Sequence, residues 1–282
     1  MNQNKTQEKV ENEEIEIHLI LEAINMKYGY DFRNYSGAHM KRRIHYRMAV
    51  TGIDTIAEMQ HKILYDVEFF NLVLSDFSIN VTEMFRDPSF YRAFRKDVIP
   101  ILKTYPFIRI WHAGCATGEE IYSMAILLKE EGLYDRSQIY ATDFNNIVLQ
   151  KAKEGIYHID DIKEYTHNYQ QSGGKSSFSD YYIAQYDSVI FDTSLKKKIT
   201  FAEHNLVTDG VFGEMHVIIC RNVMIYFNKE LQSHVIKLFS DSLSNGCFLC
   251  LGSKESVEFS TSRDSFEEFV SSEKIYRKRY FL

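Results

Sequence analysis

The first quarter of the chain carries apolar residues at helical spacing. A helix that is predicted to begin near Glu13 places five of them on one face: Ile17, Ile20, Leu21, Ile24 and Tyr28. Three further apolar stripes follow, in segments 40–48, 56–63 and 67–74. Strand signals are few here, so residues 13–84 are predicted to form an all-helical domain. The polar stretch 1–12 is predicted to be a disordered tail.

From residue 106 onward, apolar runs that suit buried strands alternate with helical stripes. The predicted strands cover four segments: 107–113, 138–142, 216–220 and 247–251. Helices are predicted after Gly118, over 146–153 and after Asn228, which would cap its helix. Such alternation is typical of a doubly wound α/β sheet. Residues 85–282 are therefore predicted to form one domain, with Asp87 capping an early helix that Pro88 begins.

Two segments of this domain depart from the simple alternation. Residues 165–199 contain a loop signal over 172–177 and then a stretch of strand composition, 181–191. The residues alone leave it open whether this is a surface excursion or a small subdomain. Residues 275–281 alternate well enough to be a closing edge strand, whose charged side chains would guard against aggregation.

The most informative stretch joins a predicted strand to a predicted helix. Gly114 and Gly118 permit a tight turn there that a Cβ atom would obstruct. The next predicted strand ends in Asp143, which lies 143 − 118 = 25 residues beyond the second glycine. Glycines that allow close backbone approach, followed by an acid that accepts from ribose hydroxyls, are typical of a nucleoside site at the carboxyl end of a parallel sheet.

The helix after this turn opens with two acids, Glu119 and Glu120. A helix amino terminus ordinarily favours phosphate, but two carboxylates would repel it. They would suit a ligand with ribose hydroxyls and positive charge, such as S-adenosylmethionine, which has an ammonium, a sulfonium and no phosphate. The alternative is that the two glutamates only offset the helix dipole. With Asp143 added, the nucleoside interpretation is favoured.

Composition and charge narrow the class further. The 282 residues are 45% hydrophobic and 26% charged, as in an ordinary soluble globular protein. The net charge of −6 argues against a general nucleic-acid binder. One local run is basic without an acid among its residues; it contains Lys41, Arg42, Arg43 and Arg47. No stretch is apolar enough to span a membrane, and the amino terminus is unlike a signal peptide, so a cytoplasmic protein without membrane insertion is predicted.

The cysteines carry little chemistry in this pattern. Cys115, Cys220, Cys247 and Cys250 lack the spacing of a disulfide framework, which predicts free thiols in a reducing compartment. The last two lie three positions apart on a predicted strand, where they would face opposite ways. We therefore predict no metal site there.

Five blocks of the sequence are similar to one enzyme family. They are Asn80 to Asp87, Trp111 to Ser123, Ala141 to Asp143, Asn205 to Leu206, and Cys220 to Phe227. Together they resemble the CheR-type chemotaxis receptor methyltransferases, which methylate glutamate carboxylates. The last block, CRNVMIYF, is nearly a fingerprint of that family by itself.

The chain departs from the family pattern at three positions. Ile121 stands where proline is usual, Ala116 where serine is common, and Met84 where a second phenylalanine is usual. None of these changes removes a polar ligand. The resemblance therefore implies a class I S-adenosylmethionine-dependent methyltransferase sheet with an antiparallel last strand, an N-terminal helical substrate-recognition domain, and a small β-subdomain at 165–199 that contacts the receptor.

The resemblance also implies the cofactor site. The cofactor would be S-adenosyl-L-methionine, with S-adenosyl-L-homocysteine as the product. Eleven positions match the family's binding residues: Asn80, Thr82, Arg86, Ala113, Gly114, Glu120, Asp143, Asn205, Leu206, Asn222 and Val223. Arg86, as a candidate catalytic residue, would pair with the methionine carboxylate or hold the incoming glutamate. Its alternative role is a salt bridge to Asp87 or Glu83.

The other implied roles divide the cofactor among the strand ends. Glu120 would take the amino group, Asp143 would accept from the ribose, and the pair Asn205 and Leu206 would frame the adenine. Asn222 with Val223 would line the methionine portion. Tyr226, the second candidate catalytic residue, either faces the methyl group or packs in the core.

The chemistry implied by the family requires little of the protein. A glutamate carboxylate is ionised at pH 7, since its ordinary pKa is about 4.3, and the leaving thioether needs no proton. Positioning is then sufficient, without a general acid or base. The partners would be the cytoplasmic helices of chemoreceptors, and the basic residues from Lys41 to Arg47 would bind these glutamate-rich helices unless they are merely a solvated face. We expect a monomer.

Two other functions fit parts of the pattern. One is a carboxyl methyltransferase of another substrate, or an RNA methyltransferase that uses the basic run. The other is a non-catalytic signalling module that senses S-adenosylmethionine or S-adenosylhomocysteine. Arg86 and Asn222 favour catalysis, although a binding protein can retain both.

Overall fold

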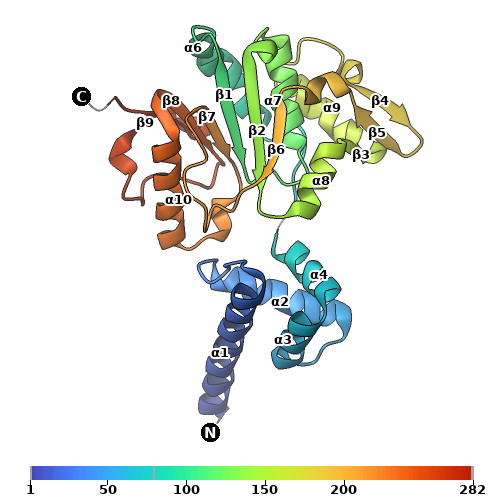
Figure 1. Cartoon of the computed structure of the whole chain (residues 1–282), viewed down its shortest axis with the longest axis vertical. Coiled ribbons are helices and arrows are strands. Elements are labelled where there is room, and N and C mark those ends of the chain that lie inside the picture. The colour runs from blue at the N-terminus through green and yellow to red at the C-terminus, as the bar shows by residue number, and fades with distance from the viewer. Residues whose placement is uncertain (1, 79, 281–282) are drawn as a thin grey trace. The chain divides into compact units, whose positions relative to one another are not determined.

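The computed structural model describes residues 2–78 and 80–280, which fall into two compact units (Figure 1). The helical unit contains the described residues up to 78 together with Tyr226–Gln232, and the sheet unit contains the remainder. The sequence placed the boundary after residue 84. It lies earlier because Met84 and Phe85 are fully buried in the core of the sheet unit. No helix within residues 2–78 and 80–280 is long and apolar enough to cross a membrane.

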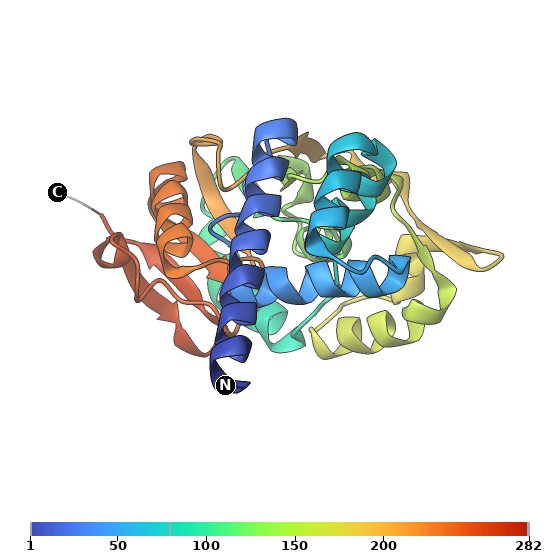
Figure 2. The same ribbon diagram turned by 90° about the horizontal axis from the view of Figure 1, so that it is seen from below.

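Four helices build the helical unit: α1 (Asn2–Tyr28), α2 (Gly37–Thr51), α3 (Ile56–Tyr65) and α4 (Val67–Phe77). Figure 2 shows α2 running at a steep angle to α1. The predicted apolar stripes form its core, and the rings of Tyr28 and Phe70 stack with centroids 3.6 Å apart. Thr55 and Asp66 cap α3 and α4 by accepting from backbone N–H groups.

The amino-terminal stretch differs from its prediction. Residues 2–12, expected to be a disordered tail, belong to α1. They include several Gln, Lys and Glu residues, which have high helix propensity, so the helix extends beyond its apolar stripe.

A later segment completes the helical unit. The backbone of Phe227 bridges Tyr35, and the two rings pack with centroids 4.9 Å apart. Asn228 donates its N–H to the carbonyl of Asn34 at 2.9 Å. Tyr226–Gln232 is thus part of the helical unit, although nearly 150 residues separate it from α4 in the sequence.

The sheet unit has seven strands in the order β6-β2-β1-β7-β8-β10-β9. The parallel strands are β1 (Ile108–Ala113), β2 (Ser137–Asp143), β6 (Ile199–Glu203), β7 (Met215–Cys220) and β8 (Leu243–Leu251). Helices α7 (Glu119–Glu130), α8 (Asn146–Glu154) and α10 (Lys229–Ser242) connect them. A broken helix precedes the sheet, as α5 (Pro88–Ala93), a π-helical turn (Phe94–Val98) and α6 (Ile99–Leu102). The doubly wound fold predicted from the sequence is confirmed.

The last strand differs from its prediction in one respect. Strand β10 (Ile275–Lys278) is antiparallel to its neighbours, as expected, but it lies between β8 and the unpredicted strand β9 (Phe266–Val270). It is therefore not the edge. Its charged residues are accommodated next to β8, where Arg277 donates to the carbonyl of Gly246 at 2.9 Å. The predicted last residue, Phe281, lies outside the described residues.

The segment in which the alternation of strands and helices was expected to break contributes to a small second sheet of order β3-β5-β4. Its strands are β3 (Ile156–His158), β4 (Tyr182–Gln185) and β5 (Ser188–Phe191), and α9 (Ile162–Gln171) lies between the first two in sequence. It begins nine residues before the predicted start at 165, because β3 supplies one edge of it. Ile199, the predicted end, already belongs to β6 of the main sheet.

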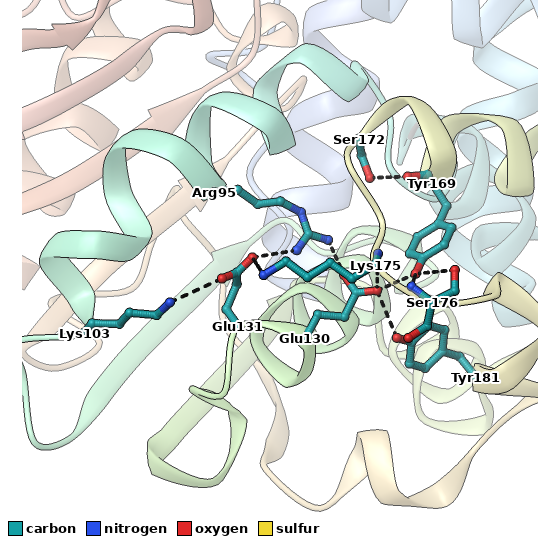
Figure 3. Close-up of polar contacts among 9 residues, drawn as sticks. All are labelled: Arg95, Lys103, Glu130, Glu131, Tyr169, Ser172, Lys175, Ser176 and Tyr181. Carbon is teal, nitrogen blue, oxygen red and sulfur yellow. Dashed lines mark hydrogen bonds and ion pairs between the residues drawn. The ribbon is translucent and has the colours of Figure 1, made fainter.

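A buried polar cluster fastens this insert to the main sheet unit (Figure 3). Glu130, the last residue of α7, accepts hydrogen bonds from the hydroxyls of Tyr169 and Tyr181 and from the backbone N–H of Lys175. Arg95 of the π-helical turn pairs with the same carboxylate at 2.5 Å. Because these donors come from the broken helix and from the insert, Glu130 at the end of α7 holds the three parts together.

Candidate functional site

The turn after β1 is fastened to the end of β2. Gly114 has φ of 79°, and the N–H groups of Gly114 and Cys115 both donate to the carbonyl of Thr142 at 2.9 Å. The hydroxyl of Thr142 also accepts from the indole N–H of Trp111 at 2.8 Å. The carboxyl ends of the two strands, with Ala113 on β1, therefore form one rigid edge.

Gly114 also lies against the segment that follows β7. A Cβ atom on Gly114 would lie 2.6 Å from Cγ2 of Val223, which no real side chain tolerates. Two residues predicted to bind the cofactor, 109 positions apart in the sequence, are thus in contact. Gly118 is similarly constrained, with φ of 95° and Ala152 2.9 Å from the position of a Cβ atom. Both predicted glycine requirements have a steric cause.

Asp143 lies beside the same turn. One carboxylate oxygen accepts the N–H of Ala116 at 3.0 Å, and the other accepts the N–H of Asn145 at 3.0 Å. Burial raises the pKa of Asp143 to about 6, against the opposing effect of these N–H groups and that of Phe144. The predicted proximity of the glycine turn and the acid is observed, and each oxygen retains capacity for a ligand hydroxyl.

The adenine residues predicted from the resemblance follow the neighbouring strand. The N–H of His204 donates to the carbonyl of Asp143 at 3.2 Å, which brings Asn205 and Leu206 beside the end of β2. Leu206 is buried, and the side-chain carbonyl of Asn205 accepts the N–H of Val207 at 3.0 Å. Asn205 therefore uses its carbonyl in its own turn and keeps its amide N–H groups for a ligand.

The two glutamates that open α7 have different surroundings. Glu119 is buried and accepts from the hydroxyl of Thr117 at 2.7 Å, and burial raises its pKa to about 7. Burial also acts to raise the pKa of Glu120, but the hydrogen bond with His112 and the charge of Arg221 outweigh it, so that pKa is lowered. Glu120 is thus held as an anion at the sheet edge.

Arg221 is a residue of this site that the sequence reasoning left without a role. Its guanidinium lies 3.2 Å from the Glu120 carboxylate and 2.6 Å from that of Asp87, and it donates to the backbone carbonyl of Arg86 at 3.2 Å. It also covers the ring of Phe90, 4.2 Å from the centroid. The signal was its place within the CRNV block, but its partners are far away in the sequence.

The segment Asn80–Asp87 is shaped by this contact. Asp87 has φ of 55° and makes no side-chain cap to α5, contrary to the prediction, because its carboxylate pairs with Arg221. Pro88 does occupy the start of α5. Phe85, with φ of 52°, donates its N–H to the hydroxyl of Ser123 at 2.9 Å. These anchors fix the backbone on both sides of Arg86.

The side chains that the segment Asn80–Asp87 presents remain accessible. Arg86 is half-buried and donates to the carbonyl of Val81 at 3.2 Å. Asn80 and Thr82 are half-buried as well. Within the described residues, the ion pair of Asp87 is formed with Arg221 instead of Arg86, which leaves the guanidinium of Arg86 available to a ligand.

The remaining predicted residues belong to the helical unit. The ring of Tyr226 packs on His39 with centroids 4.8 Å apart, and its carbonyl accepts from Ser36 at 2.8 Å. In the basic run, Lys41 pairs with Glu13 at 2.8 Å and Arg47 pairs with Asp76 at 2.5 Å.

The basic run is therefore smaller at the surface than predicted. The side chain of Arg47 is only 11% exposed and pairs with Asp76, so it is less accessible to a docking partner than the sequence suggested. The acids that pair with Arg47 and Lys41 belong to α4 and α1. They lie outside the basic run, so the run's own sequence does not reveal them. Arg42 is exposed and Arg43 half-exposed.

All four cysteines are free thiols and buried. His112 and His216, interpreted as structural, have partners: His112 lies 3.1 Å from Glu120, and His216 accepts the N–H of Arg109 at 3.0 Å.

Comparison with known proteins covers both units. A model of the CheR methyltransferase SAM-binding domain matches residues 80–275, and a model of the CheR methyltransferase all-alpha domain matches residues 15–78. The chain is 51% identical to a Pseudomonas putida protein named as the methyltransferase Cher3, over 95% of this chain and 98% of that protein. It is 30% identical to the chemotaxis protein methyltransferase of Listeria innocua (81% and 85%) and 26% identical to that of Borreliella burgdorferi (91% and 93%).

These matches confirm the fold class, the family and the cofactor that the sequence predicted. The sheet unit is a class I methyltransferase domain that binds S-adenosylmethionine, and the helical unit is the all-alpha domain of the same family. The acids of the site, Glu120 and Asp143, and the absence of phosphate from this cofactor fit one another. The chain belongs to the CheR methyltransferase family.

Proposed function

We propose that this protein methylates glutamate side-chain carboxylates on the cytoplasmic helices of chemoreceptors, using S-adenosylmethionine. The observation that carries the proposal is the common edge on which Asp143, Glu120 and the backbone of Arg86 are held, the last two joined through Arg221. This edge offers acids to the cationic, hydroxylated part of a cofactor and a guanidinium to a carboxylate. The named chemotaxis methyltransferases among the relatives support the receptor as the substrate.

The residues of the sheet unit divide the work of binding. Bound S-adenosylmethionine supplies a methyl group on a positively charged sulfur. Asp143 would accept hydrogen bonds from the ribose, and Glu120 would attract the amino group, with its carboxylate kept in place by Arg221. Asn222 and Val223 would line the methionine portion, with Val223 packed against Gly114.

The transfer itself needs orientation more than proton chemistry. The cofactor would supply a methyl group to a carboxylate oxygen of the substrate glutamate, and the electron pair of the methyl–sulfur bond would stay on sulfur. No proton moves, since the glutamate is ionised at neutral pH. Arg86 orients a carboxylate by a bidentate contact, and such positioning accounts for much of the rate.

Tritiated methyl transfer to receptor-containing membranes tests this function. We expect label on the receptor that mild base releases as methanol, because methyl esters hydrolyse readily. Arg86→Ala should abolish most of the transfer. The variant should stay folded, and adenosylhomocysteine should still raise its melting temperature. Arg92→Ala is the matched control, since Arg92 is an exposed arginine of α5 that contacts the carbonyl of Gln171.

Three other outcomes would contradict this proposal in whole or in part. Label that resists base would indicate a nitrogen acceptor and would end the carboxyl proposal. Cofactor binding without transfer to any membrane or soluble acceptor would favour the sensing module. Full turnover by Arg86→Ala would leave that arginine without a catalytic role.

A further inference from the structure

Glu255 follows β8 and is buried, with 5% of its surface exposed. One carboxylate oxygen accepts the N–H groups of Gly252 at 2.6 Å and Asn222 at 3.0 Å. The other accepts the N–H groups of Val223 at 2.9 Å and Met224 at 2.7 Å. Four backbone donors therefore converge on a single side chain, and three of them belong to the consecutive residues after β7.

This arrangement is a backbone anion site that the chain fills itself. Asn222 is in the left-handed region with φ of 62°, which turns successive N–H groups toward one point. Such concave sets of N–H groups bind phosphates and other anions in many proteins. The four donors require an acceptor at each contact, so the geometry selects the ionised carboxylate, which has no hydrogen to donate.

The loop after β8 approaches the turn after β7 closely at Gly252. A Cβ atom on Gly252 would lie 2.8 Å from the N–H nitrogen of Asn222 and 2.7 Å from the Glu255 carboxylate. Glycine is therefore needed where the loops after β7 and β8 meet. On the opposite side, Val223 fills the space above Gly114. Val223 is thus fixed by two contacts: its N–H donates to Glu255, and its side chain packs against Gly114.

We propose that Glu255 is a positioning residue for cofactor binding: its carboxylate holds Asn222 and Val223 in the left-handed turn that lines the methionine portion. The inference rests on the assignment of these two residues to the cofactor site. Without the carboxylate, all four N–H groups lose their common acceptor, and Asn222 relaxes away from its strained conformation. The site for adenosylhomocysteine is then no longer preformed.

Chemical rescue distinguishes this role from simple packing. In Glu255→Ala we expect adenosylhomocysteine to bind roughly 10- to 100-fold more weakly by calorimetry, as the loss of one or two buried hydrogen bonds would give. Added formate or acetate should restore much of the affinity by occupying the vacated anion site, while chloride at equal ionic strength should not. Glu258→Ala, a nearby exposed acid paired with Arg263, should bind like wild type and show no rescue.

Two further measurements keep the outcome decisive if Glu255→Ala does not fold. Glu255→Asp has a shorter side chain that cannot reach all four donors, and it should show a smaller loss of affinity. In the wild type without ligand, the N–H groups of Val223 and Met224 should exchange slowly with solvent because Glu255 already holds them. Wild-type affinity in a folded Glu255 variant, or rapid exchange at these two N–H groups, would overturn the proposal. Neither result would affect methyl transfer to glutamate as the proposed function.

Discussion

Asp143 is the residue whose surroundings most directly favour a ligand. Its carboxylate is buried and accepts backbone N–H groups from both flanking turns, so its position is fixed before any ligand arrives. A preformed acceptor of this kind loses little conformational entropy on binding.

Replacing Asp143 should weaken adenosylhomocysteine binding. Asp143→Ala removes the hydrogen bond to the ribose and the acceptor that fixes the two flanking turns, so we expect a loss of roughly 1–3 kcal/mol by calorimetry. Asp135→Ala, which changes an acid before β2, should bind normally. Unchanged affinity in a folded Asp143→Ala protein would show that Asp143 does not bind the ribose.

Glu119 makes a prediction about pH. Because its pKa is raised to about 7 from an ordinary value of 4.5, its contribution to stability is fully present below pH 4.5 and is lost as the pH rises through 7. Glu119→Gln cannot ionise and should lack this loss. Between pH 5.5 and 8 the wild type should therefore lose on the order of 2 kcal/mol of unfolding free energy relative to the variant. Urea unfolding of both proteins at the two pH values measures it, and parallel pH dependences would show that Glu119 does not titrate in this range.

At the scale of the element, α2 shows how a charge run divides once the chain is folded. Lys41 and Arg47 are neutralised by acids of α1 and α4, and Arg47 is buried. Arg42 and Arg43 carry the surface charge that remains. Any electrostatic docking of an acidic receptor helix through α2 therefore depends on these two.

Charge reversal at these positions tests docking. Arg42→Glu with Arg43→Glu should raise the apparent KM for receptor, most at low ionic strength, because a Debye length of about 8 Å screens the attraction at physiological salt. Affinity for adenosylhomocysteine should stay the same. Lys151→Glu with Lys153→Glu on α8 changes the net charge equally and is the matched control. Equal effects of the two pairs would mean that overall charge, and not α2, governs the encounter.

At the scale of the whole molecule, features with a local cause were predictable. The helical stripes, the strand–turn–helix at Gly114 and the proximity of Asp143 follow from spacing along a few turns or strands. What depends on distant partners was missed. Arg221 meets Asp87 across 134 positions, and Glu255 meets Asn222 across 33, so neither role is visible in the neighbouring sequence. Strand β9 was missed because Glu267 and Glu268 break its apolar pattern, although β10 pairs with it.

The discontinuous helical unit has a consequence for the order in which this protein is made. Tyr226–Gln232 supplies Phe227 against Tyr35 and Asn228 against Asn34, yet a ribosome reaches these residues long after α4. At roughly 5–20 residues per second, the delay is on the order of 10–30 seconds. During that time the nascent helices expose the surface that Phe227 later covers. In a newly synthesised chain, chaperones and proteases can therefore reach this surface until Tyr226–Gln232 has been synthesised.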